Sequence, residues 1–112
     1  YFTGGVNYDR FLSAISMNRN LKLAEKNGKT SLFSRLTREK DSYLKHQVAW
    51  YKFNKEIFIY NTFTRKWIFL DDNEFTARAG ASLLLLNKCF IIVGGEIKPG
   101  IRTSDVILLR IL

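Results

Sequence analysis

Two short apolar runs that end in a pair of glycines constrain this fold more than any other feature of the sequence. The runs Ser82–Leu86 and Cys89–Val93 are joined at Asn87-Lys88, and Gly94-Gly95 follows directly. Each run has the length and the aliphatic content of a strand, and the glycines allow a turn where a Cβ would clash. Both faces of these strands are apolar, so we expect another layer to cover each face. The pattern predicts an antiparallel strand pair within a mainly β fold.

The combination of a strand and a double glycine occurs a second time, at the start of the chain. Tyr1-Phe2-Thr3 precedes Gly4-Gly5 as the later strand precedes its own glycine pair. A unit that recurs with other strands between its copies indicates an internal repeat. The other predicted strands are Glu56–Tyr60, Lys66–Leu70 and Asp105–Leu112.

A basic segment with helical spacing separates the two copies. We expect a helix from Asp9 to about Asn18 with Asp9 as its cap, a loop or a frayed connection over Asn20–Thr30, and a helix from Ser31 to about Lys52. Residues 9–55 hold eleven Lys and Arg against four Asp and Glu, whereas residues 56–112 hold seven against six. The excess positive charge therefore belongs to the helices, where a solvated face explains it, and no nucleic-acid partner is expected.

Few residues of this chain are suited to metal or thiol chemistry. Cys89 is the single cysteine and lies in an apolar strand, so we interpret it as a core residue. With His46 as the single histidine, we expect no metal site and no cofactor. No apolar run has membrane-spanning length, so no membrane partner is predicted. Because the chain starts at Tyr1 and ends within a strand, we expect an internal piece of a longer protein.

The stretch after the second double glycine is the candidate functional site. Between Gly95 and Thr103, a carboxylate (Glu96), an ammonium (Lys98) and a guanidinium (Arg102) surround a Pro99-Gly100 turn. A charged loop held between rigid strands is a common place for binding and catalysis, although a plain polar connection is equally compatible with the spacing. Trp67, in a predicted strand, is interpreted as a packing residue rather than a ligand contact.

Strand, double glycine, strand, hairpin and a Trp-bearing strand, repeating at roughly 50 residues, resemble the kelch repeat of β-propellers. The chain further resembles the bacterial N-acetylneuraminate epimerase (sialic acid mutarotase) family. The matching stretches are Gly4–Asn7, the insertion from Asp9 to about Lys52, Asn54–Trp67 and Gly95–Thr103. The last is the most specific, because it matches Gly-Glu-x-Lys-Pro-Gly-Leu-Arg-Thr with Ile101 in place of Leu.

The resemblance implies a partial kelch-type β-propeller of about one to two blades with an α-helical insertion. Residues 1–8 would end one blade, residues 9–53 would form the insertion, and residues 54–112 would supply blade strands and the Gly95–Thr103 active-site loop. It also implies an isomerase of carbohydrate metabolism that interconverts the α and β anomers of sialic acid, with this piece alone inactive. The alternative is a non-catalytic kelch module that binds proteins through its loops.

Roles for individual residues also follow from the resemblance. Glu96 would be the acid/base residue and Arg102 the substrate-binding residue, while Lys98 would add positive field without a catalytic role. Asn7, in the other double-glycine loop, would either reach the same central mouth or serve only the turn. The resemblance further implies a periplasmic location, with sialic acid as the partner molecule and a homodimer as the assembly to consider.

Overall fold

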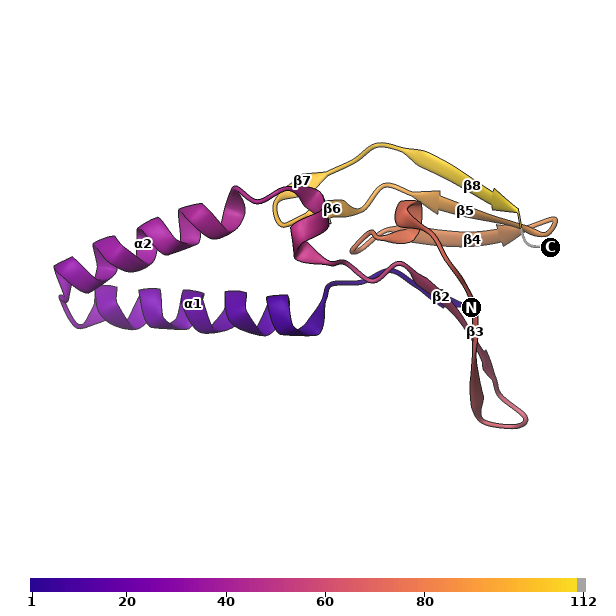
Figure 1. Cartoon of the computed structure of the whole chain (residues 1–112), viewed down its shortest axis with the longest axis horizontal. Coiled ribbons are helices and arrows are strands. Elements are labelled where there is room, and N and C mark those ends of the chain that lie inside the picture. Colours follow the sequence, from indigo (N-terminus) through magenta and orange to yellow (C-terminus); the bar gives the residue numbers. More distant parts are fainter. Residues whose placement is uncertain (111–112) are drawn as a thin grey trace. The chain divides into compact units, whose positions relative to one another are not determined.

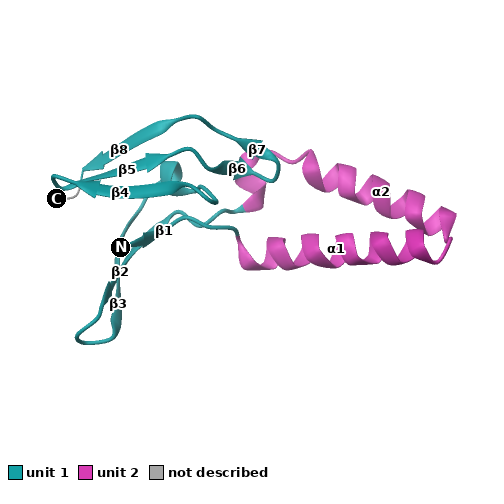
Figure 2. Ribbon diagram, turned by 180° about the vertical axis from the view of Figure 1, so that it is seen from behind, with its two compact units in different colours: residues 1–6, 52–112 teal, residues 7–51 magenta. Residues whose placement is uncertain are grey.

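The computed structural model describes residues 1–110, which belong to two compact units. Unit 1 comprises residues 1–6 and the chain from Lys52 onward, and it carries every strand of the described part. Unit 2 comprises Asn7–Tyr51 and is helical (Figures 1 and 2). Its bounds lie two residues before those predicted for the insertion, 9–53.

The described elements follow one another in the order β1, α1, α2, β2 to β8, with two short 3-10 helices. Their bounds are β1 Phe2–Thr3, α1 Tyr8–Lys26, α2 Thr30–Leu44, a 3-10 turn Val48–Tyr51, β2 Glu56–Asn61, β3 Lys66–Asp72, a 3-10 turn Glu74–Thr76, β4 Ser82–Leu86, β5 Cys89–Val93, β6 Glu96–Lys98, β7 Ile101–Arg102 and β8 Val106–Arg110. No helix among residues 1–110 is both long and apolar enough to cross a membrane.

The first helix begins one residue before the predicted start and continues far past the predicted end. Asn7, rather than Asp9, caps α1, because its Oδ1 accepts a hydrogen bond from the amide of Arg10 at 3.1 Å. The predicted loop or frayed connection over Asn20–Thr30 is wrong for residues 20–26, where α1 continues to Lys26 and buries Ala24, and only residues 27–29 connect the two helices.

Asn27-Gly28 ends α1 in a Schellman motif. The amide of Lys29 bonds to the carbonyl of Ala24 at 3.0 Å and that of Gly28 to Glu25 at 3.2 Å. This geometry needs the positive φ of 66° at Gly28. The motif turns the chain into α2, which runs back along α1 and buries Leu36 (Figure 1).

The second helix ends at Leu44, well before the predicted end near Lys52. A 3-10 turn follows, and in it Trp50 stacks on the ring of His46 with the centroids 3.7 Å apart. The guanidinium of Arg10 lies 3.8 Å from the centre of the same indole. The ring of Tyr51, which contacts those of Tyr43, His46 and Trp50, is fully buried.

Tyr43 predicts a pH dependence for the helical unit. Burial of its phenol, together with the neighbouring Tyr51, raises the pKa of Tyr43, while Arg10 acts in the opposite direction. The unfolded chain then ionises Tyr43 first, near its ordinary pKa of 10.0, so folding stability is lost as the pH rises above that value.

We therefore expect Tyr43→Phe to lower the free energy of unfolding by about 1 kcal/mol at pH 8, because phenylalanine lacks the hydroxyl that donates a hydrogen bond to the carbonyl of Arg10. The difference between the two proteins should shrink above pH 10. Urea denaturation followed by circular dichroism at pH 8 and pH 10.5 measures both values. A difference that grows with pH would contradict the assignment.

Unit 1 contains two three-stranded antiparallel sheets and a small hairpin. The first sheet has the order β1-β2-β3, the second has the order β4-β5-β8, and β6 pairs with β7. The strands predicted at Ser82–Leu86 and Cys89–Val93 are confirmed at both ends. Asn87 and Lys88 form their two-residue turn with φ of 50° and 64°, the geometry of a type I′ hairpin.

The core lies between the inner faces of the two sheets. Ile57 of the first sheet and Phe90 and Ile92 of the second are all buried. The ring of Tyr1 contacts that of Phe90 edge to face, with the centroids 4.9 Å apart. Burial of these aliphatic and aromatic side chains is the main favourable contribution to the stability of this unit.

The outer faces of both sheets are open, which contradicts the expectation that another layer covers each face. Trp67, interpreted from the sequence as a packing residue, packs against other rings but is 58% exposed, so it does not lie in the core of this chain. Its ring meets those of Phe2 and Tyr60 on the outer face of the first sheet, and Leu84 and Leu108 lie open on the second. Each sheet turns one face toward the interior that the two sheets share, so its other face stays exposed although its side chains are apolar.

Candidate functional site

The predicted loop after Gly95 is a β-hairpin. β6 and β7 pair as antiparallel strands around a turn at Pro99-Gly100, with Glu96 directly opposite Arg102. Two backbone hydrogen bonds close its base, from Gly94 to Asp105 at 3.0 Å and from Thr103 to Gly95 at 2.9 Å. The hairpin therefore leaves the end of β5 and returns directly into β8.

Glu96 and Arg102 form a cross-strand ion pair. Residues directly opposite in an antiparallel pair project from the same face, and Arg102 Nη1 lies 3.8 Å from Glu96 Oε1. The side chains are 64% exposed for Arg102 and 34% for Glu96. An ion pair this exposed adds little to the stability of the fold. The same exposure leaves both groups accessible to a dissolved molecule.

The backbone of Glu96 is fixed by the connection that leads into β4. Ala79 and Glu96 exchange two hydrogen bonds, from Ala79 N to Glu96 O at 3.0 Å and from Glu96 N to Ala79 O at 2.8 Å. Gly95 is buried beside this connection, and a Cβ at that position would lie 2.8 Å from the Cβ of Ala81. The backbone that carries the Glu96 carboxylate is therefore held by its hydrogen bonds to Ala79 and by the close packing of Gly95 against Ala81.

The other candidate residues have different surroundings. Lys98 lies on β6 opposite Ile101 and is half-buried. Asn7 accepts the capping hydrogen bond of α1 and so has a structural role in unit 2. Cys89 lies in β5 and is half-buried, whereas His46 stacks on Trp50 in unit 2. Among residues 1–110 no three His, Cys, Asp or Glu side chains gather in a way that could hold a metal ion.

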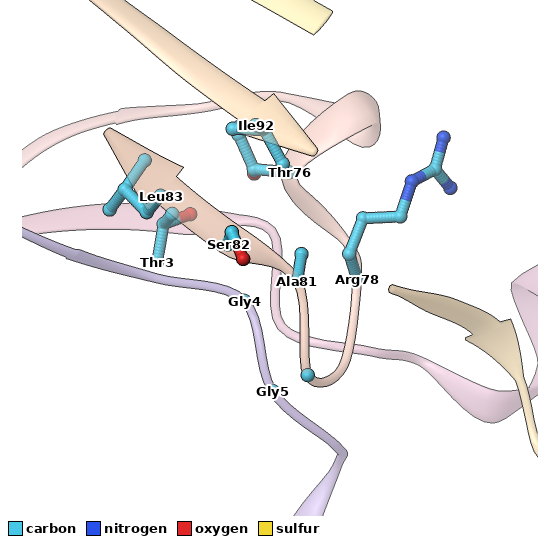
Figure 3. Close-up of a pocket in the computed structure, with 10 residues that line it drawn as sticks. Thr3, Gly4, Gly5, Thr76, Arg78, Ala81, Ser82, Leu83 and Ile92 are labelled. Carbon is cyan, nitrogen blue, oxygen red and sulfur yellow. The ribbon is translucent and has the colours of Figure 1, made fainter. Parts of the chain in front are cut away.

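A cavity of about 250 Å³ lies beside the connection 78–81, in unit 1 (Figure 3). Its lining is mostly backbone and small side chains, contributed by Thr3, Gly4, Gly5, Thr76, Arg78, Gly80, Ala81, Ser82, Leu83 and Ile92. Neither Glu96 nor Arg102 lines it. The close approach of Gly4, where a Cβ would lie 2.5 Å from the carbonyl oxygen of Arg78, indicates a packing contact between two turns. We do not assign the cavity to the site.

The prediction from sequence overlooked Arg78 and Asp105. Arg78 Nη2 lies 3.8 Å from Asp105 Oδ2, and the Arg78 side chain is only 11% exposed. The carbonyl of Asp105 accepts the hydrogen bond from Gly94 that closes the hairpin, so this second ion pair lies at its base. The one indication in the sequence is an arginine in the short Ala/Gly-rich connection Arg78-Ala79-Gly80-Ala81.

Comparisons with known proteins agree on one family. The family model described as N-acetylneuraminate epimerase matches residues 1–111. An N-acetylneuraminate epimerase of Vibrio cholerae is 26% identical over 108 residues, which are 94% of this chain and 26% of that protein. One from Brucella melitensis is 32% identical over 72 residues, covering 63% of this chain and 19% of the relative.

A solved structure titled "Structure of YjhT" superposes with a TM-score of 0.73 at 26% identity, over 96% of this chain and 29% of that one. The chain thus spans between a fifth and a third of the length of these proteins. The expected fold class is confirmed: the chain is mainly β, a partial kelch-type propeller with an α-helical insertion. A match along nearly the whole chain identifies it as a member of the N-acetylneuraminate epimerase family.

Proposed function

We propose that the intact protein is a mutarotase that interconverts the α and β anomers of N-acetylneuraminate, and that this chain supplies its acid/base group. The observation that carries the proposal is the Glu96–Arg102 pair, 3.8 Å apart on one accessible face of a hairpin. The names of the relatives support the reaction class and the substrate. The chain covers only part of those relatives, so the activity belongs to the whole protein.

The reaction needs a group that can take and return a proton. The anomers differ in configuration at one hemiketal carbon, so exchange requires the ring to open and to close on the other face. Glu96 removes the proton of the anomeric hydroxyl as the bond from the anomeric carbon to the ring oxygen breaks, and it then passes that proton to the former ring oxygen, which becomes a hydroxyl. Reclosure reverses these transfers, so no atom or electron is gained or lost. A positioned carboxylate contributes in this way as a general base and then as a general acid.

Arg102 suits the other feature of the substrate, a carboxylate attached to the anomeric carbon. A guanidinium offers two parallel N–H donors that match the two oxygens of a carboxylate. With Arg102 beside Glu96, binding of the sugar acid brings its reacting carbon near the base. A periplasmic location and a homodimeric assembly stay proposals that rest on the family resemblance.

The direct test is to follow anomer exchange by proton NMR, starting from the α anomer with and without the intact protein. We expect the exchange rate to increase in proportion to protein concentration. A rate equal to the spontaneous one would contradict the proposal. Recovery of a bound protein partner together with that result would favour the non-catalytic kelch module.

Arg102 carries its own prediction. Arg102→Met removes a charge-assisted contact worth roughly 1.5–3 kcal/mol, so KM for N-acetylneuraminate should rise between about tenfold and a hundredfold. Arg102→Lys keeps the charge without the planar fork and should give an intermediate KM. Arg65→Met, at an exposed turn of the β2–β3 hairpin, is the matched control. An unchanged KM in Arg102→Met would exclude this arginine from substrate binding.

A further inference from the structure

Both backbone polar groups of Arg78 are hydrogen-bonded. Its amide donates to the carbonyl of Thr76 at 2.7 Å, and its own carbonyl accepts from Gly5 at 2.8 Å. The next residue, Ala79, exchanges two backbone hydrogen bonds with Glu96. Arg78 is therefore attached through the backbone to the point where the Glu96–Arg102 hairpin begins.

The side chain of Arg78 reaches the point where the same hairpin ends. Figure 3 shows the guanidinium turned away from Gly4 and Ser82. Its Nη2 lies 3.8 Å from Asp105 Oδ2, and the carbonyl of Asp105 accepts the hydrogen bond from Gly94 that closes the hairpin. Arg78 thus contacts the exit of the hairpin with its side chain, while the backbone of the next residue, Ala79, is bonded to the entry.

The energetics of this contact favour a role beyond holding the fold. At 3.8 Å the pair is an ion pair without hydrogen-bond geometry, and Asp105 is 64% exposed, so solvent weakens the attraction. Arg78 Nε is buried and has no hydrogen-bond partner within residues 1–110. Burial of a guanidinium in this way costs desolvation that an apolar residue would avoid. What the arginine adds is a contact between the connection that is bonded to the entry of the hairpin and the residue at its exit.

We propose that Arg78 is a positioning residue, which holds Glu96 and Arg102 in register by linking the entry and exit of their hairpin through Asp105. This inference rests on the proposed function for the role of the pair itself. Arg78 does not need to touch the substrate. Its effect on the reaction passes through the geometry of the carboxylate and guanidinium on β6 and β7.

The test compares Arg78→Met, Asp105→Asn and the double variant in the intact protein. Misplacement of a reacting group by a fraction of an ångström to one ångström lowers rates strongly, so each single variant should lower kcat between about tenfold and a hundredfold. KM should change far less. Because both changes break the same link, the double variant should be no slower than the slower single variant. Arg38→Met, at an exposed position of α2, is the control.

Two further measurements separate positioning from general support of the fold. Arg78→Lys keeps a cation that can reach Asp105 and should restore part of kcat. Hydrogen exchange resolved by NMR should show faster exchange of the amides of Gly94 and Thr103, which close the hairpin, with unchanged exchange in β5. General destabilisation would increase exchange in β5 as well.

Three outcomes would overturn the proposal. A raised KM with normal kcat in Arg78→Met, and no effect of Asp105→Asn, would make Arg78 a direct substrate contact. Normal kcat and normal exchange in both variants, with Glu96→Gln inactive, would exclude positioning and leave the proposed function intact. If Glu96→Gln is fully active, the proposed function fails. In that case, unchanged hydrogen exchange of the Gly94 and Thr103 amides in Arg78→Met would separately exclude the link from Arg78 to Asp105. If Arg78→Met does not fold, Arg78→Lys and Asp105→Asn decide.

Discussion

Glu96→Gln is expected to slow the anomer exchange of N-acetylneuraminate by about 10²- to 10⁴-fold, the usual contribution of a positioned acid/base group. Glutamine has the shape of glutamate but cannot accept the proton of the anomeric hydroxyl. The fold should be unaffected, because the side chain of Glu96 is one-third exposed and its ion pair with Arg102 is open to solvent. Proton NMR of the two anomers measures the rate, and thermal unfolding checks the fold.

The matched control for this prediction is Glu74→Gln. Glu74 is an exposed carboxylate in the 3-10 turn Glu74–Thr76, outside the hairpin, so its substitution should leave the rate within about twofold of the unchanged protein. If Glu96→Gln keeps a comparable rate, Glu96 is not the acid/base residue. Equal losses in the two variants would indicate a general effect of net charge.

Gly95→Ala is expected to give the largest loss of stability, about 2–5 kcal/mol in the free energy of unfolding. Gly95 has a φ of 89°, a left-handed conformation that is unfavourable for alanine. The new Cβ would also lie 2.8 Å from the Cβ of Ala81 and 3.1 Å from the carbonyl oxygen of Ala79. Because that connection is bonded to Glu96, the substitution should also disturb the site.

Gly100→Ala separates the two causes. Gly100 has a similar φ of 79°, but a Cβ there has no neighbour within 4 Å. It should therefore cost only the conformational term, about 1–2 kcal/mol. Urea denaturation of the two variants measures the difference, which reports the close approach at Gly95 alone. Equal losses would mean that the backbone between Gly95 and Ala79 relaxes to accept a side chain.

Two strands of the second sheet, β4 and β5, could be predicted from local sequence to the residue. Ser82–Leu86 and Cys89–Val93 are uninterrupted apolar runs, and Asn87-Lys88 and Gly94-Gly95 mark where they stop. The ends of the helices are harder to predict, because several polar residues near each end can serve as a cap. Asn7 competes with Asp9 for the cap position, and Ala24, which α1 buries, lies among polar residues just before Lys26.

The proximity of Glu96 and Arg102 followed from local chemistry, whereas the contacts that hold them did not. A Pro99-Gly100 turn between short strands brings residues six apart into opposition. The bridge from Ala79 to Glu96 and the ion pair from Arg78 to Asp105 join positions 17 and 27 apart, and no local pattern encodes them. The exposure of Trp67 was equally hidden, because an apolar strand has the same sequence with or without a layer over its outer face.

The most direct test of the account is a crystal structure of the intact protein with N-acetylneuraminate bound. The account predicts the sugar carboxylate on the guanidinium of Arg102, with the anomeric hydroxyl or the ring oxygen within hydrogen-bond distance of the Glu96 carboxylate. A sugar bound elsewhere, with the two side chains still paired to each other and remote from it, would contradict the central claim.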